Sequence, residues 1–360
     1  MVKLPQAIPF WLKFCLIFPL FFLNGWLGLL LLGYLQPFTS LLVTAIILAF
    51  LLNFPIQVLQ KRGIQRLVAV GIVLTVALLV LGILGLTLVP LIIEQLSGLV
   101  ASLPSLIDSG TQQLAVIQKW AIAQKLPANF GEVAEREIQQ LSGLLQATSS
   151  QLLNFILGTI NSLINIFLLL VLTIFMVLNG ERSWEGIFSW LPLNWRQPLQ
   201  LSLQQTFQSY FAAQALLAGI LSLAQTIVFV VLGVPYAVLF GVSIGLTTLI
   251  PYASTVMVVV VSGLVALQDF TLGLKVLSSA IMIGLINDNV VSPRLVGGSI
   301  GLNPIWLIIA LFIGGKVSGV LGLVIAVPIA SVIKRMADVM RTPGAQRSPL
   351  ESAAIESSNA

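Results

Sequence analysis

Long apolar runs dominate the pattern of residues along this chain. Three stretches carry no Asp, Glu, Lys or Arg, and they span 27, 43 and 72 residues: 67–93, 138–180 and 197–268. One helical membrane crossing needs about 20 apolar residues, so these stretches are long enough for several crossings. The runs are unbroken rather than alternating, which favours helices over a membrane β-barrel. We expect crossings at 14–35, 38–59, 67–93, 152–178, 212–233, 237–267, 271–287 and 304–333.

The segment 95–150 departs from this pattern because Gln, Ser, Glu and Lys are frequent in it. Its leucines at 96, 99 and 103, followed by Leu106 or Ile107, recur at helical spacing and predict an amphipathic helix. Ile138, Leu141 and Leu145 predict a second one. We expect a small helical insert outside the membrane, either as a packing or oligomerisation element or as a cap over a transport route. Another weakly polar helix is expected at 197–214.

Positive side chains predict the orientation, because Lys and Arg are retained on the cytoplasmic side of short loops. An eight-crossing arrangement with both termini inside leaves 12 of the 17 Lys and Arg residues on the inner side. These 12 are Lys3, Lys13, Lys61, Arg62, Arg66, Arg182, Arg196, Lys275, Lys334, Arg335, Arg341 and Arg347. The net charge of +5 is then a consequence of topology and of anionic inner-leaflet lipids, and no nucleic-acid partner is expected.

The amino-acid composition excludes several classes of protein and of catalytic site. Hydrophobic residues make up 58% of the 360 residues and charged residues only 8%, which excludes a water-soluble globule. The chain has no histidine and a single cysteine, Cys15, so a Ser-His-Asp triad, a Cys-His dyad and a His/Cys zinc cluster are excluded. No cofactor or metal is expected.

Two apparent motifs fail on inspection. Gly241-Val-Ser-Ile-Gly245 fits the nucleophile-elbow pattern, but no strand precedes it and no histidine can take the serine proton. The same residues spell G-x-x-x-G, which favours close helix packing in lipid. Gly314-Gly-Lys316 is followed by Val317 and so is no phosphate-binding loop. We therefore expect no enzyme and no ATP hydrolysis, and any transport must use a gradient.

Polar residues interrupt two apolar helices between 285 and 316. Asp288 follows Lys275 by only 13 positions, which places it within the membrane zone if Lys275 marks the inner surface. A charged side chain there costs about 2.5–3.5 kcal/mol on insertion scales, so Asp288 is a site candidate facing a polar cavity. Arg294 is close enough to pair with it. The alternative is a structural loop in which the two residues only fix each other.

Lys316 is the other isolated charge, flanked by several glycines. It is interpreted either as snorkelling to an interface or as holding an anionic group such as the Asp288 carboxylate.

Several short motifs in the last third of the chain together resemble one known family. They are Ile250-Pro251-Tyr252, Asp288-Asn289, Ser292-Pro293-Arg294, Gly297, Ile300-Gly301-Leu302, Pro304, Gly314-Gly315-Lys316, Gly319, Gly322 and Ala326-Val327-Pro328. This order is similar to that of the AI-2E transporter family, also described as PerM-type permeases of the bacterial inner membrane. The resemblance covers about residues 10–338. It implies roughly eight crossings and a plasma-membrane location, with export of the furanone signal autoinducer-2 (quorum sensing) in some members and Na⁺ or Li⁺ exchange for protons in others.

The chain also departs from the family pattern. Ser254 and Thr255 stand where the family commonly has glycine and proline, Gly298 where it often has a basic residue, and Asn303 where it often has histidine. A mechanism that needs a titrating histidine at that position cannot operate here.

The sequence thus predicts an all-α polytopic membrane protein with about eight transmembrane helices and a small extracytoplasmic helical insert. The expected divisions are 1–94 (helices 1–3), 95–150 (insert), 151–340 (helices 4–8, with a broken segment at 285–304) and 341–360 (a disordered cytoplasmic tail). We expect a multi-pass protein of the bacterial inner membrane with both termini cytoplasmic. Lipid, a small polar solute, H⁺ or Na⁺, and a homo-oligomer are the partners considered.

The predicted function is secondary transport or export of a small polar solute, with autoinducer-2 as one candidate. A Na⁺(Li⁺)/H⁺ antiporter and a non-transporting oligomeric membrane scaffold are the alternatives. Asp288 is the expected coupling or solute group, oriented by Arg294, with Lys316 nearby. Tyr252, Asn287 and Asn289 are expected to supply hydrogen bonds. Helix breaks or close packing are expected at Pro251, Pro293, Gly297, Gly301, Pro304, Gly315 and Gly319, with Pro251 interrupting the long span 237–267.

Overall fold

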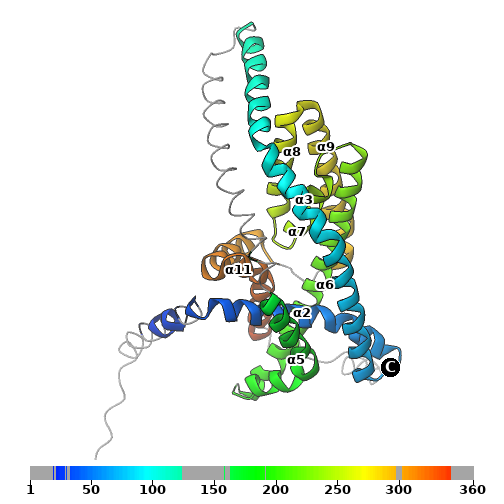
Figure 1. The fold of residues 1–360 in the computed structure, drawn as a ribbon. Coiled ribbons are helices and arrows are strands. Elements are labelled where there is room, and N and C mark those ends of the chain that lie inside the picture. Colours follow the sequence, from blue (N-terminus) through cyan, green and yellow to red (C-terminus); the bar gives the residue numbers. More distant parts are fainter. Residues whose placement is uncertain are drawn as a thin grey trace, which may run out of the picture.

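The computed structural model describes residues 33–123, 163–190, 192–296 and 302–341, together with Pro19, residues 22–28, Leu30 and Gly158. Every regular element of the described part is a helix, and the described part contains no strand. Figure 1 shows the arrangement of its helices. They are α2 (Gln36–Lys61), α3 (Arg66–Ala123), α5 (Leu163–Phe188), α6 (Leu193–Val231), α7 (Ala237–Thr247), α8 (Ala253–Gln268), α9 (Phe270–Ile286), a π-helical turn η1 (Asn287–Val291), α10 (Ser292–Val296) and α11 (Pro304–Arg341).

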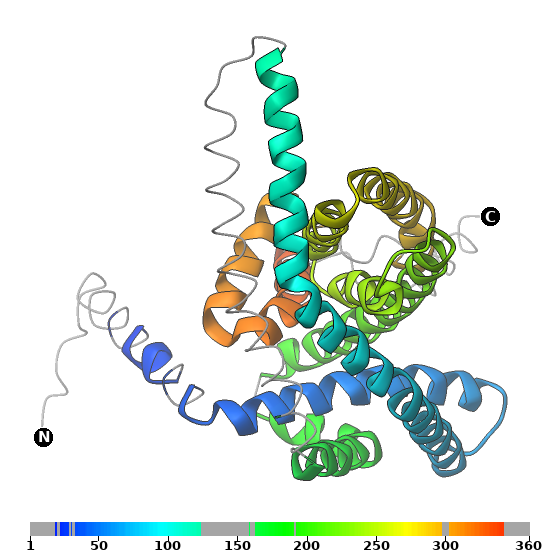
Figure 2. The ribbon, with the colours of Figure 1, turned by 45° about the horizontal axis from the view of Figure 1, so that its top comes forward.

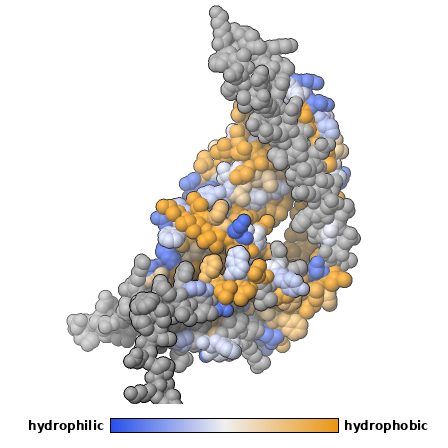
Figure 3. Space-filling model, turned by 90° about the vertical axis from the view of Figure 1, so that its left-hand side faces the viewer, coloured by the Kyte–Doolittle hydropathy of each residue, from blue (hydrophilic) through white to orange (hydrophobic). Residues whose placement is uncertain are grey.

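Five described stretches are long and apolar enough to cross a membrane: Phe38–Lys61, Arg66–Gln113, Arg196–Val231, Phe270–Leu295 and Pro304–Asp338. Three shorter apolar helices accompany them, at Ile164–Gly180, Ala237–Thr247 and Ala253–Gln268. These helices confirm the predicted all-α polytopic membrane class. Many large apolar side chains are exposed on their outer faces, and hydrophobic residues cover much of the described surface in Figure 3. Such a surface is suited to lipid rather than to water.

The largest core lies among α6, α7, α8 and α9, with the middle of α3 packed beside them (Figures 1 and 2). Phe229 and Val276 are fully buried at its centre. Close packing of α6 on α7 depends on two glycines, as expected for the G-x-x-x-G pattern. A Cβ on Gly241 would lie 2.7 Å from the Thr226 Cα, and one on Gly245 would lie 2.6 Å from the Ala218 carbonyl oxygen.

A second packed region joins α2, α3, α5 and the first half of α6. Ile56, Ala69 and Val177 from three of these helices share one cluster. Aromatic rings connect α2 to α6, since the Phe50 and Phe207 ring centroids lie 5.6 Å apart. Figure 2 shows α2 running across this end of the molecule. The weakly polar helix expected at 197–214 is thus the first part of the same continuous helix as the predicted span 212–233.

α7 and α8 are both too short to cross a bilayer core of about 30 Å. With 11 and 16 residues, they measure about 16 and 24 Å at a helical rise of about 1.5 Å per residue. The predicted span 237–267 is therefore divided into two short helices joined by the apex 248–252, which contains Pro251. Tyr252 ends this apex in the left-handed backbone region at φ 67°. Such non-spanning segments are tolerated within a membrane where protein or a water-filled cavity surrounds them.

α11 is also bent back on itself. Ser318 and Gly319 have non-helical backbone angles, and Gly319 has φ 59° and ψ −135°. The two arms meet through glycine, because a Cβ on Gly322 would lie 2.6 Å from the Gly314 carbonyl carbon. The sequence predicted a crossing at 304–333 without this bend, since a glycine-rich apolar run can form a tight hairpin as well as a spanning helix.

α3 is one continuous helix across residues 94–95, where the sequence predicted the end of a crossing and the start of the insert. The expected amphipathic face is buried: Leu96, Leu103 and Leu106 are each at most 8% exposed. Leu96 packs into the α6–α9 core, and the Gln113 amide donates to the Leu267 carbonyl at the end of α8. The second predicted amphipathic helix and the tail after Arg341 lie outside the described residues.

Candidate functional site

A crevice of about 200 Å³ opens where α6, the α7–α8 pair and the end of α9 converge. Its apolar lining comes from all four helices. Its polar lining consists of Gln225 from α6, Ser254 and Thr255 from the start of α8, and Asn287 and Asp288 from η1. Because α8 begins at the apex, its first polar turn faces the polar turn of η1. The crevice therefore lies beside the α7–α8 apex, inside an otherwise apolar bundle.

Two amide oxygens in this crevice have no hydrogen-bond partner. Gln225 is fully buried, and its amide nitrogen donates to the Ala280 carbonyl oxygen at 3.3 Å while Oε1 is unpaired. Asn287 is 5% exposed, and its amide nitrogen donates to the Asp288 carboxylate at 3.1 Å while Oδ1 is unpaired. A buried acceptor without a partner costs about 1–3 kcal/mol, so both positions favour a ligand that supplies donors or positive charge.

The π-helical turn explains how these side chains reach the crevice. In η1 the Ser292 backbone N–H donates to the Asn287 carbonyl, five residues back. The additional residue in the turn changes which side chains face the bundle, and such turns occur frequently at functional sites. Pro293, which has no N–H to donate, follows directly. The segment predicted as broken at 285–304 is thus helical up to Val296, and residues 297–301 are not among those described.

The structure brings two of the six predicted site residues together in the crevice, Asn287 and Asp288. Asp288 is itself exposed at the crevice edge, and the hydrogen bond shown for its carboxylate comes from Asn287. Asn289 is exposed and donates to the Leu285 carbonyl at 2.8 Å. Tyr252 is 56% exposed at the apex without lining the crevice.

The two basic candidates lie elsewhere. Arg294 is exposed on α10, and Lys316 is exposed on the first arm of α11, close to its bend. Neither lines the crevice. Of the predicted break and packing positions, Pro304 begins α11, Gly315 packs against Leu323 across the hairpin, and Gly319 forms the bend. Gly297 and Gly301 lie outside the described residues.

Sequence reasoning did not select Gln225, Ser254 or Thr255 as site residues. Gln225 is the most informative omission, because it is a fully buried amide in the middle of an apolar run. A lone glutamine at that depth is a usable signal, since an unsatisfied polar side chain in a membrane span is costly. Ser254 and Thr255 were noted only as departures from a family pattern.

A model of the AI-2E family transporter matches residues 16–342. The chain belongs to the AI-2E transporter family. It is 35% identical over 328 residues to sll0063 of Synechocystis sp. strain PCC 6803, a protein named as a candidate transport protein, and the match covers 90% of this chain and 83% of the relative. A second Synechocystis protein of the same description, sll0060, is 32% identical, covering 93% and 97% of the two chains.

A more distant relative carries a more specific name. The AI-2 transport protein TqsA of Escherichia coli K12 is 22% identical over 303 residues, covering 81% of this chain and 83% of TqsA. Membership of the AI-2E family, together with the long apolar helices, makes this chain a multi-pass membrane protein of a family of transporters and permeases.

Proposed function

We propose that this AI-2E family member is a secondary transporter of a small polar solute, and that the solute binds in the crevice formed by Gln225, Asn287 and Asp288. The observation that carries the proposal is the pair of buried, unpaired amide oxygens beside a carboxylate. All three groups accept hydrogen bonds, so the matching solute presents several donors. Ser254 and Thr255 can act as donor or acceptor and complete the polar lining.

The surrounding helices support this proposal. Paired short helices whose apex lies within a bundle are a recurring way to build a solute site in transporters. Here the first turn of α8, which directly follows the apex 248–252, and the polar turn of η1 border the same crevice. A change in the position of the α7–α8 pair would expose the crevice without unfolding any long helix. Autoinducer-2, the solute in the printed name of TqsA, is one candidate solute for this chain.

A Na⁺(Li⁺)/H⁺ antiporter is the second candidate, and the same donor set favours it. Sodium is bound by oxygen ligands, and the two amide oxygens and the Asp288 carboxylate supply three. In inverted vesicles with an imposed proton gradient, addition of NaCl or LiCl would then dissipate the gradient, whereas a polar organic solute would not.

The test is transport in proteoliposomes with variants that alter the crevice and a control variant next to Asp288 on η1. Asp288→Asn and Gln225→Leu alter the crevice, and Asn289→Ala alters an exposed neighbour that does not line it. We expect the first two to lower flux at least about tenfold, which corresponds to loss of roughly 1.4 kcal/mol, and the third to leave it unchanged. Equal flux in all four proteins would refute the site. No flux of autoinducer-2, other small polyols or cations by the wild type would favour the scaffold alternative.

A further inference from the structure

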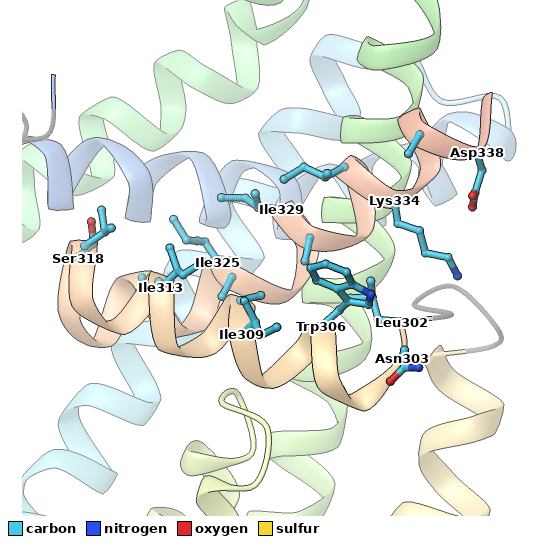
Figure 4. Close-up of a pocket in the computed structure, with 18 residues that line it drawn as sticks. Leu302, Asn303, Trp306, Ile309, Ile313, Ser318, Ile325, Ile329, Lys334 and Asp338 are labelled. Atoms are coloured by element: carbon cyan, nitrogen blue, oxygen red, sulfur yellow. The ribbon is translucent and has the colours of Figure 1, made fainter. Parts of the chain in front are cut away.

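The hairpin of α11 borders a second cavity among the described residues, an open wedge of about 730 Å³ between its two arms. The arms touch near the bend, through Gly314 and Gly322, and separate toward Asn303 on one arm and Lys334 on the other (Figure 4). The volume falls within the range of about 300–1,000 Å³ that is typical of sites for small organic ligands. The wedge is far larger than a packing defect and is lined almost entirely by α11.

The lining is divided by polarity along the wedge. Apolar side chains from both arms cover most of it: Ile309, Ile313, Ile325, Ile329 and Ile333. The charged groups and Asn303 lie at the wide end, where Figure 4 shows Asn303, Lys334 and Asp338 with the Trp306 ring beside them; the Ser318 hydroxyl is at the bend. Trp306 is 63% exposed and Ile313 is 58% exposed, so the wedge opens to the surface. The matching occupant is an amphiphile with a long apolar part and a polar end.

The place of the wedge identifies the kind of amphiphile. Only 6% of the most apolar window of α11 is buried, the lowest share among the five long apolar helices of the described residues. Positive residues mark the cytoplasmic side, so Lys334 and Arg335 put the wide end at the inner surface. The arm from Pro304 to Val317 is about 21 Å long and so leaves the bend inside the bilayer. The wedge thus runs from the inner headgroup region toward the bilayer centre.

We propose that the α11 wedge binds one glycerolipid of the inner leaflet, with an acyl chain between the two arms and the headgroup at Asn303, Lys334 and Asp338. The lining at this end includes the Lys334 ammonium and the Asp338 carboxylate, which complement the phosphate and the ammonium of a zwitterionic headgroup better than they complement a headgroup of net negative charge. Trp306 would lie at the level of the glycerol backbone, as interfacial tryptophans do.

A lipid fits this wedge better than a protein partner does. The space lies between two arms of a single hairpin that converge at a glycine contact, so only a thin, flexible chain can fill it to its narrow end. A helix is about 10 Å across with its side chains and cannot enter that end. A second copy of this chain remains an outcome of the tests below.

The first experiment uses the unmodified full-length protein. It is reconstituted in vesicles that contain trace glycerolipids with a photoreactive diazirine in the acyl chain and either a neutral or an anionic headgroup. After illumination, the labelled peptides are mapped by mass spectrometry. We expect labelling of residues 309–333 on both arms of α11 to exceed that of exposed α3 residues 78–86 and to be stronger with the neutral lipid. Equal labelling of α11 and α3 would overturn the proposal.

The second experiment compares variants of the full chain. Ala330→Phe fills the wedge, whereas Val320→Phe adds the same ring at an exposed position of α11 outside it. We expect the lipid that co-purifies with the protein, measured by native mass spectrometry, to fall roughly tenfold in the first variant and to be unchanged in the second. Asp338→Asn removes a carboxylate from the lining and should shift the bound lipid toward anionic species.

Two results would contradict this inference. One is retention of the same lipid in Ala330→Phe and the wild type. The other is a change in oligomeric state by light scattering in Ala330→Phe without a change in lipid content, which would assign the wedge to a second copy. If Ala330→Phe does not fold, the photolabelling of the wild type still decides the question.

Discussion

Replacement of Gln225 by methionine tests whether the buried amide that we assign to solute binding also lowers the stability of the protein. Gln225 is fully buried, with one unpaired oxygen and one hydrogen bond of 3.3 Å to the Ala280 carbonyl. Removing an unpaired buried acceptor raises the free energy of unfolding by about 1–3 kcal/mol, and losing the hydrogen bond lowers it by about 0.5–1.5 kcal/mol. Ala280 lies within α9, so its carbonyl retains the partner four residues on. Methionine has a similar volume, so the net change should be a stabilisation of about 1 kcal/mol.

The matched control is the same substitution at Gln208, also on α6. The Gln208 amide donates to Gln57 Oε1 on α2 at 3.1 Å, so this change leaves a half-buried acceptor without its partner. We expect Gln208→Met to destabilise by about 1 kcal/mol and to leave transport unchanged. Gln225→Met should do the opposite: a higher Tm and at least about tenfold lower flux.

The assay is thermal unfolding of the purified proteins in one detergent, followed by tryptophan fluorescence, together with flux in proteoliposomes. If Gln225→Met lowers Tm as much as Gln208→Met does, the Gln225 oxygen has a partner and does not destabilise the fold. If Gln225→Met transports at the wild-type rate, Gln225 does not bind the solute.

Three further substitutions, the first with a matched control, test the framework around the crevice and the wedge. Gly319→Ala should lower the free energy of unfolding by about 1–3 kcal/mol, because φ 59° with ψ −135° is essentially a glycine conformation. Its control, Gly263→Ala on the open face of α8, should raise the stability slightly. The Tm values of the two variants should therefore shift in opposite directions. Gly245→Val should cost about 1–3 kcal/mol by forcing α6 and α7 apart, seen as a lower midpoint in denaturant. Gln113→Ala should cost about 1 kcal/mol and increase amide exchange at the end of α8.

The class of the fold was predictable because it depends only on the length of apolar runs. Charge-free stretches such as 197–268 leave no alternative to several membrane helices. The hairpin in α11 was not predictable from the same information. Gly319 permits a bend but does not require one, and only the contact between Gly314 and Gly322 in space distinguishes a hairpin from a crossing. The interruption near Pro251 was easier to foresee because a 31-residue span exceeds the bilayer core.

The sequence could predict those site residues that form a cluster of polar positions within an apolar run. Asn287 and Asp288 are adjacent polar residues at the end of an apolar run, and this pattern in the sequence predicts a site there. Gln225 stands alone, 62 residues earlier, and its relevance depends on α6 and α9 being neighbours. Arg294 and Lys316 were grouped with Asp288 because they are close in sequence. That neither residue lines the crevice follows from the course of the chain after η1, which no local pattern records.

One hydrogen bond between distant segments limits how this molecule can move. The Leu239 backbone N–H, in the first turn of α7, donates to Gln95 Oε1 on α3 at 2.8 Å. The start of α7 and the centre of α3 must therefore travel together unless that bond breaks. Pro90 lies just before this anchor and removes one backbone bond from α3. If the two packed regions of the molecule shift against each other, the joint in α3 belongs at Pro90, on the side of the anchor nearer to α2.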